Sequence, residues 1–462
     1  MSTAIAARTP AAVRRMAGLS LIELMVTLVI SSIVIIGLVT LVNAIGVANR
    51  TQDGLARLQE NGRFAMQRIA ADLRAASAQH CSNFDSAASS VIGPFPNIYV
   101  DTARAAFSYF NAATNPSLRL GPTGFGAPYL LSPRFMMVGH ECAIGACTPA
   151  LNAANRGVNL LGAAIPNMGS AVGQRAQGAD VLTVRYLTGE GVRVVNQREW
   201  QAGGARPVID VVNDPAELAR AGFAGMTANS PIWVSDCGLS EMFLGTIVGP
   251  PPAPAPGVVS IEMTPANFTS DRMRRLDVVN NARAYHLPTA LRTVSYYLLI
   301  ANDNRTPGRL ISVLMRKEGA NVAQGLVEGI ERFDLLYGVE DSQGRTRYLT
   351  AAQVDALGAL SQDCPPNPAN ILPAPALSQN EPGCGWRAVK SIEVYLLANT
   401  VEDISSTNDD EFRYSWLNDG TPNNAAQFEN PQALGATRNG LPAGRMLRRE
   451  FRTLVNLRGY NY

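Results

Sequence analysis

The chain has 462 residues, of which 47 % are apolar and 16 % charged, and its formal net charge is +2. This length and composition predict a real hydrophobic core in one large domain or two to three small ones. The first 18 residues contribute three arginines and no acid, so the rest of the chain is close to neutral. A general nucleic-acid-binding protein carries a basic field, and the composition argues against that class.

The first predicted element is an apolar run over residues 19–42, which contains a single charge, Glu23. About 20 apolar residues at 1.5 Å each cross a bilayer core of roughly 30 Å, so the run is long enough to span a membrane. A carboxylate inside such a run costs about 2.5–3.5 kcal/mol, and Glu23 therefore needs a partner. The run follows a basic leader that ends in Gly18. A secretory signal loses its apolar region on cleavage, whereas this run would lie after the cut and be kept.

These residues resemble the type IV prepilin signature, in which a glycine precedes the cut, a hydrophobic residue follows it, and the fifth mature residue is glutamate. The resemblance implies that a prepilin peptidase cleaves between Gly18 and Leu19 and that Leu19 is N-methylated. Most family members carry Phe or Met where this chain has Leu19. In a filament, the carboxylate of Glu23 would meet the free N-terminal amine of a neighbouring subunit and set the axial register. The alternative is an ordinary signal anchor with a stray glutamate.

The charge distribution around the apolar run predicts its orientation in the membrane. Arg8, Arg14 and Arg15 precede the run, and no comparable basic cluster follows it directly. The N-terminus is therefore expected in the cytoplasm, with residues beyond about 45 on the outer side of the inner membrane. An even number of cysteines fits disulfides in that oxidising space.

We expect three disulfides, although six cysteines allow 15 pairings and the sequence leaves the choice open. A Cys142–Cys147 disulfide would close a short loop. A Cys364–Cys384 disulfide would close a longer proline-rich loop and stabilise the fold by about 3 kcal/mol. Cys81 and Cys237 then remain as the third pair by elimination.

Residues 43–77 remain helical in character but become amphipathic. Apolar side chains recur at three-, four- and seven-residue steps: Leu55, Leu58, Ala65, Ile69, Leu73 and Ala76. Charge pairs are expected on the opposite face: Asp53/Arg57, Glu60/Arg63 and Arg68/Asp72. No proline interrupts residues 11–93, so we predict one helix over residues 19–77, roughly 88 Å long. Its glycines mark either close helix contacts or tolerated small residues: Gly37, Gly46, Gly54 and Gly62.

Residues 78–462 are expected to form one α+β globular domain on the outer side of the membrane. Alternation and β-branched content predict early strands over residues 180–187, 191–195, 207–212, 231–235 and 258–263, with a helical turn at 215–221. Later strands are predicted over residues 292–300 and 309–316 as a hairpin, then 326–337, 386–399 and 445–458, with Thr350 capping a helix that ends near residue 360. Long loops are expected at residues 88–178, 249–257, 364–384 and 400–440.

The predicted fold class is thus a pilin-like α+β fold, with a long N-terminal helix packed on an antiparallel β-sheet domain. The sequence shows no internal repeat and no strand–helix alternation of the parallel kind. Six aromatic residues on the predicted strands are interpreted as core residues: Tyr296, Tyr297, Phe333, Tyr337, Trp386 and Tyr395.

Catalytic chemistry is poorly supported by the sequence. The three histidines are isolated from one another, and no serine-hydrolase, zinc-protease or phosphate-loop motif occurs. A zinc site built on His140, Glu141 and the nearby cysteines matches no standard spacing, and acidic loops at 302–304 and 408–411 match no calcium-binding loop. We predict no catalytic residue, cofactor or metal site. A membrane-anchored periplasmic enzyme remains the alternative from a different class.

Beyond the helix, residues 57–77, 179–186, 235–238 and 448–458 resemble the PilW family of type IV pilus minor pilins. The resemblance implies a subunit that joins other minor pilins and the major pilin and primes assembly at the filament tip. Such a subunit lies in the inner membrane before assembly and supports twitching motility, adhesion or DNA uptake; direct nucleic-acid binding is not predicted. The order of elements from residue 326 onward also resembles the J-type minor pseudopilin of type II secretion, which is the alternative.

Overall fold

A computed structural model describes the chain over part of its length. The described residues are 20–76, 98–101, 137–151, 165–198, 208–236, 240–248, 257–263, 276, 278, 282–319, 321–340, 344–357, 371–372, 384–404, 414–415, 441 and 445–457. They fall into two compact units, Met1–Gly54 and Leu55–Tyr462.

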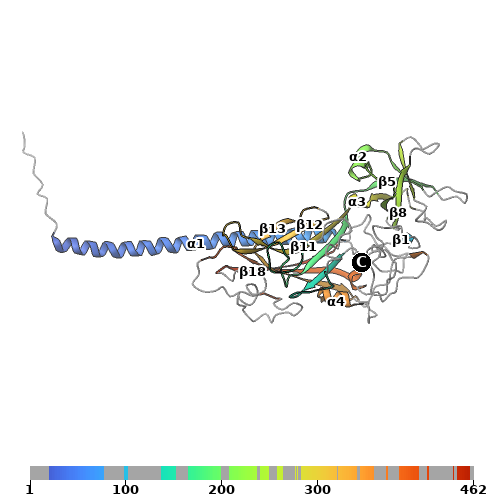
Figure 1. Ribbon diagram of the computed structural model, residues 1–462. Helices are drawn as coiled ribbons and strands as arrows, with labels where there is room; N and C mark the ends of the chain where they lie inside the picture. The colour runs from blue at the N-terminus through green and yellow to red at the C-terminus, as the bar shows by residue number, and fades with distance from the viewer. Residues whose placement is uncertain are drawn as a thin grey trace, which may run out of the picture. The chain divides into compact units, whose positions relative to one another are not determined.

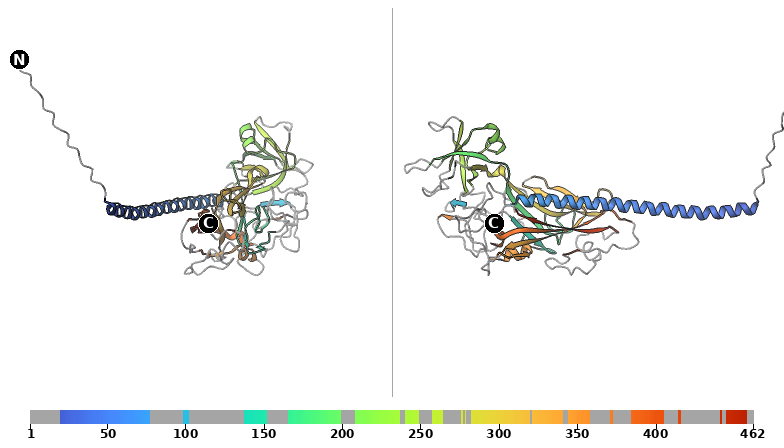
Figure 2. Two further views of the ribbon diagram at one scale, coloured as in Figure 1. Left: turned by 60° about the vertical axis from the view of Figure 1, so that its left-hand side comes forward. Right: turned by 180° about the vertical axis from the view of Figure 1, so that it is seen from behind.

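A single helix, α1 (Leu21–Ala75), supplies the described part of the first unit and begins the second (Figures 1 and 2). The predicted long N-terminal helix is therefore confirmed between these bounds. In the first unit every side chain from Ser20 to Arg50 is exposed, including the whole apolar run. In the second unit the helix buries one face, and the side chains on it recur at three- and four-residue steps as an amphipathic helix requires: Leu58, Ala65, Met66, Ile69, Ala70 and Leu73.

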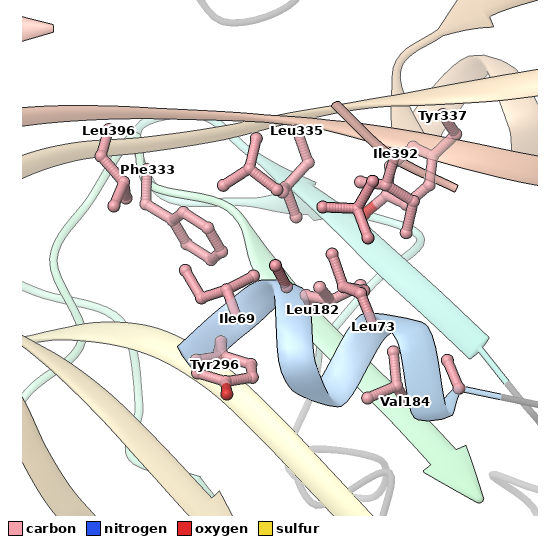
Figure 3. Packing of buried hydrophobic residues seen from close by; sticks show 14 of the residues in the cluster. Ile69, Leu73, Leu182, Val184, Tyr296, Phe333, Leu335, Tyr337, Ile392 and Leu396 are labelled. Carbon is pink, nitrogen blue, oxygen red and sulfur yellow. The ribbon is translucent and has the colours of Figure 1, made fainter. Parts of the chain in front are cut away.

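Two antiparallel sheets build the core that receives this helix face. The first has the order β13 (Gln324–Glu328), β12 (Leu310–Glu318), β11 (Leu291–Asn302), β4 (Val181–Leu187), β2 (Met137–Cys142) and β3 (Cys147–Thr148). The second has the order β15 (Thr346–Leu349), β14 (Ile330–Glu340), β17 (Val389–Asn399) and β18 (Arg448–Asn456). One hydrophobic cluster takes side chains from the helix and both sheets. Figure 3 shows Ile69 and Leu73 of α1 facing Phe333, Leu335 and Ile392.

The third sheet forms mostly between β4 and β11, and six of its strands close into a barrel. Around the ring these are β5 (Val192–Arg198), β6 (Val208–Val212), β9 (Val258–Met263), β8 (Ser240–Val248), β7 (Ser230–Ser235) and β10 (Arg283–His286), all paired antiparallel. Two short strands, β1 (Ile98–Asp101) and β16 (Ile371–Leu372), extend β8 in parallel. The barrel has its own hydrophobic cluster, as expected for a small barrel filled by side chains. We call residues 188–290, which leave β4 and return to β11, the barrel insert.

Two short helices, α2 and α3, belong to the barrel insert, and a third, α4, follows β15 of the second sheet. α2 (Pro215–Arg220) is capped by the carboxylate of Asp214, and α3 (Leu287–Ala290) leads directly into β11. α4 (Ala351–Ala356) starts at Thr350, whose side chain and that of Gln353 form a capping box. The predicted cap at Thr350 is confirmed, although the helix ends earlier than residue 360.

Most of the predicted strands are confirmed, including the hairpin of β11 and β12. The single strand expected over residues 326–337 is wrong, because Gly329 has φ +80° and separates β13 from β14, which belong to different sheets. A side chain at Gly329 would also collide with Asn399. The strand expected from residue 386 begins later, since η5 (Cys384–Ala388) is a 3-10 helix. The six aromatic residues interpreted as core residues are all buried.

A strand packs closely against the second half of α1 at Gly62. A methyl group added to Gly62 would lie 2.4 Å from the ring of Phe451 on β18, whereas at Gly37 and Gly46 it would meet nothing within 4 Å. Gly62 therefore marks a close contact, but with a strand, β18, and not with another helix as the first interpretation expected.

Gly62→Ala is expected to lower the free energy of unfolding of the second unit by about 1–2 kcal/mol, because overpacking outweighs the better helix propensity of alanine. The measurement is urea denaturation of the full chain in detergent micelles, followed by tryptophan fluorescence. Gly46→Ala is the control and leaves the transition unchanged. Adding Phe451→Leu to Gly62→Ala restores part of the loss; a double variant no more stable than Gly62→Ala alone would contradict the assigned contact.

Candidate functional site

The first candidate site is the start of α1. Glu23 lies in the first helical turn, where a negative charge interacts favourably with the helix dipole. It is exposed, and it is the only ionisable residue from Ser20 to Asn49. Gly18 and Leu19, the predicted cleavage and methylation positions, lie outside the described residues.

The other polar side chains in this apolar stretch satisfy their hydrogen bonds within the helix. The hydroxyl of Thr27 donates to the carbonyl of Leu24 at 2.9 Å, and Thr40 donates to Gly37 at 2.8 Å. Ser31 and Ser32 make the same kind of bond one turn back. Such internal bonds allow hydroxyls inside a hydrocarbon layer. Between residues 21 and 42, Glu23 is thus the polar group that requires a partner from elsewhere.

By its length and hydropathy, α1 is able to cross a membrane. Its apolar stretch is exposed on all sides, which is unfavourable in water over such an area and indicates that lipid or other helices cover it.

The second candidate site fixes α1 to the first sheet and is centred on Asp72. Its carboxylate accepts hydrogen bonds from one residue on each of three adjacent strands, β4, β11 and β12. Arg316 donates through Nε at 2.7 Å and through Nη2 at 3.2 Å. The hydroxyl of Tyr186 donates at 3.0 Å, and that of Tyr296 donates to the other oxygen. Asp72 and Arg316 are each about 5 % exposed, so we call these four residues the buried Asp72 anchor.

The electrostatics of the buried Asp72 anchor favour the charged form of the carboxylate. Burial by itself would raise the pKa of Asp72, but the hydrogen bonds from Arg316 and Tyr296 and the charge of Arg316 outweigh it and lower the pKa. Burial and the neighbouring carboxylate raise the pKa of Tyr186 to about 12, so this phenol remains a donor. Arg316 also donates to Glu318 at 2.8 Å. The anchor therefore contains a fully hydrogen-bonded ion pair.

The buried Asp72 anchor is not among the predicted features. The expected Arg68/Asp72 pair on the face opposite the apolar stripe is wrong, because Asp72 is buried and bonds Arg316, 244 residues away in the sequence. The helical spacing carried a signal for this burial, because Asp72 lies three residues after Ile69 and four before Ala76 and so falls on the apolar face.

The expected disulfide residues lie partly within the described structure. Cys142 and Cys147 form a disulfide across the β2–β3 hairpin, where they are directly opposite. The other two expected pairs lie outside the residues whose side chains are described. Nδ1 of His140 donates a hydrogen bond to the carbonyl of Pro149, and in the described ranges no three metal-binding side chains converge. Asp303, in the first acidic loop, lies 4.0 Å from Nε of Arg309; residues 408–411 are not described.

Comparison with known proteins gives two matches. Residues 296–459 match the family Type IV Pilus-assembly protein W, PilW, and residues 13–39 match the prokaryotic N-terminal methylation motif. The first match runs from β11 to β18 and includes two members of the buried Asp72 anchor, Tyr296 and Arg316. The chain matches no curated protein and no solved structure. The chain is thus similar to PilW-type prepilins in its N-terminal motif and over its last third, and its apolar α1 fits an anchor in the inner membrane.

Proposed function

We propose that this protein is a minor pilin that joins other minor pilins and the major pilin and primes assembly of a type IV pilus at the filament tip. One observation carries the proposal: the PilW match covers most of β11 and all of β12, β14, β17 and β18, which pack with α1 in one core, and the methylation motif covers the start of that helix. The same observation supports a pilus subunit over the J-type pseudopilin of type II secretion. The role is structural, and no catalytic residue is assigned.

Removal of the leader would prepare the subunit for assembly in two ways. It creates a free amine at Leu19, one helical turn before Glu23, and it leaves the apolar part of α1 as the mature N-terminus. A carboxylate and an ammonium compensate each other in hydrocarbon, whereas either alone is strongly penalised. Pairing of Glu23 with the amine of a neighbouring subunit therefore favours entry at one axial position.

The size of the second unit supports a position at the filament tip. The barrel insert adds a closed barrel with its own core to the sheets that hold α1. A subunit at a filament end has neighbours on one side only, so this bulk is tolerated there more easily than along the shaft.

Gly18→Val is expected to block cleavage, because a branched side chain replaces hydrogen at the residue next to the cut bond. The precursor keeps its leader and migrates more slowly on gel electrophoresis, as it does in a peptidase-null strain. Gly37→Val, in the same apolar helix, is the control and is processed normally. Unchanged migration in the peptidase-null strain would contradict processing as a prepilin.

The tip role is tested by deleting the gene and counting surface pili by electron microscopy. We expect at least a tenfold loss, restored by the wild-type chain, with antibody label at filament ends in the complemented strain. Full piliation of the deletion strain, or label along the whole filament, would refute the role. Loss of protein secretion with normal piliation would favour the pseudopilin instead.

A further inference from the structure

A polar cavity of about 560 Å³ opens where the barrel insert leaves β4 and returns to β11. The turn from Thr188 to Gly191, the helices α2 and α3, and the ends of β5, β10 and β11 line it (α2, α3 and β5 in Figure 1). The volume lies in the usual range for small-molecule sites, roughly 300–1,000 Å³. Nothing in the PilW match covers this region, since that match begins at residue 296.

Four arginines and two glutamates face this cavity, so its described lining carries an excess of positive charge. The arginines are Arg193, Arg220, Arg283 and Arg292. Two of them have a carboxylate partner: Arg283 lies 3.4 Å from Glu217, and Arg292 lies 3.5 Å from Glu318. Within the described structure, the side chains of Arg193 and Arg220 have no such partner.

The pairing of the strands places two of these charges face to face. In the register of β10 on β5, Arg283 lies directly opposite Arg193. Like charges in directly opposite positions destabilise a sheet, and their side chains begin only about 5 Å apart. Glu217 offsets this repulsion in part, because Oε1 accepts from Arg283 and from the backbone N–H of Arg193. A cross-strand arginine pair that lacks full compensation is the kind of local cost that functional sites carry.

We propose that this cavity binds an acidic sugar, whose carboxylate or phosphate is held between Arg193 and Arg220. The guanidinium fork matches the two oxygens of such a group and forms paired hydrogen bonds with it. An anion at this position also compensates the repulsion between Arg193 and Arg283. This site is independent of the pilus role and makes no use of Glu23 or the buried Asp72 anchor.

The two glutamates define the rest of the ligand. Glu190 and Glu217 offer only acceptor oxygens, which bind hydroxyl donors and repel further negative charge. A polyanion such as a nucleic acid is therefore disfavoured, and a single acidic group on a hydroxyl-rich ring is favoured. A lining that is more polar than apolar disfavours a fatty ligand.

The test is ligand-observed NMR on the full chain in detergent micelles, with glucuronic acid, glucose 6-phosphate and glucose as probes. One or both acidic sugars are expected to bind, and which of them binds identifies the acidic group. Glucose is expected to bind at least tenfold more weakly, and inorganic phosphate is expected to compete less well than the bound sugar. The double variant Arg193→Gln/Arg220→Gln is expected to lose binding at least tenfold.

Arg449→Gln removes one exposed positive charge on β18, as Arg220→Gln alone does, and as the control it is expected to retain binding. The double variant is expected to keep its melting temperature, because removing Arg193 relieves the cross-strand repulsion; if it does not fold, Arg220→Gln alone carries the test. Four results would overturn the proposal: no binding of either acidic sugar, equal binding of glucose, equal competition by phosphate, or equal loss in the control.

Discussion

Asp72→Asn is expected to lower the free energy of unfolding of the second unit by about 3 kcal/mol. Removing one partner of a buried ion pair leaves the other charge without compensation, which typically costs about 3–5 kcal/mol. The lower end applies because Arg316 keeps its bond to the carboxylate of Glu318. The measurement is urea denaturation followed by tryptophan fluorescence, to which Trp386 contributes from the same core as the helix.

Glu60→Gln is the matched control for this prediction. Glu60 is an exposed acid on the same helix, and its neutralisation is expected to change the free energy of unfolding by less than about 0.5 kcal/mol. An Asp72→Asn variant as stable as the Glu60→Gln variant would show that the buried Asp72 anchor does not hold the helix.

The pH dependence of the free energy of unfolding tests the role of Asp72 independently. Because the pKa of Asp72 is lowered in the folded chain, its contribution is fully present above the ordinary carboxyl pKa of about 3.9 and is lost as the pH falls below it. The wild-type chain and the Asp72→Asn variant should therefore differ most near neutral pH and converge in acid. If the difference in the free energy of unfolding stays the same in acid, the variant is destabilised by altered packing and not by loss of the ion pair.

Glu23→Leu is expected to leave membrane insertion intact and to reduce incorporation into filaments at least tenfold. Insertion improves, because about 2.5–3.5 kcal/mol of cost for a buried carboxylate disappears. Incorporation fails, because the incoming subunit has no charge to pair with the N-terminal amine of its neighbour. The measurement compares the amount of protein in the membrane fraction with that in sheared pili.

Two further variants separate charge from shape at this position. Glu23→Gln keeps the shape of the side chain without its charge and is expected to behave as Glu23→Leu does. Leu28→Val, on the same exposed apolar stretch, is the control and is expected to enter filaments normally. Normal incorporation of the Glu23→Gln variant would show that the charge of Glu23 is not needed for assembly into filaments.

Local patterns in the sequence predicted the parts of the fold that depend on neighbouring residues. The apolar run, the hairpin of β11 and β12, the cap at Thr350 and the strand β4 each have a pattern within one short segment. The buried Asp72 anchor could not be predicted in this way, since its partners on β4, β11 and β12 are 114 to 244 residues distant.

The barrel, too, could be predicted from local patterns only in part. Its strands β5, β6, β7 and β9 were predicted one by one, but β8 and β10 were missed and the closure was not foreseen. Closure depends on the pairing of β8 with β9 and on the position of β10 between β5 and β7. Neither of these pairings produces a periodic pattern in the sequence. The cavity arginines were overlooked for the same reason, because they come from four separate segments.

The way the barrel insert joins its host has a consequence for how such a protein can change over time. Its two ends are neighbours: Leu187 pairs with Leu291, and the backbone N–H of Thr188 donates to the carbonyl of Ala290 at 2.9 Å. Host strands therefore hold the two ends together whatever lies between them, which is the condition under which inserted domains are tolerated. Surface residues of the barrel insert can therefore change freely, whereas the residues of the two sheets that pack on α1 remain constrained by that packing.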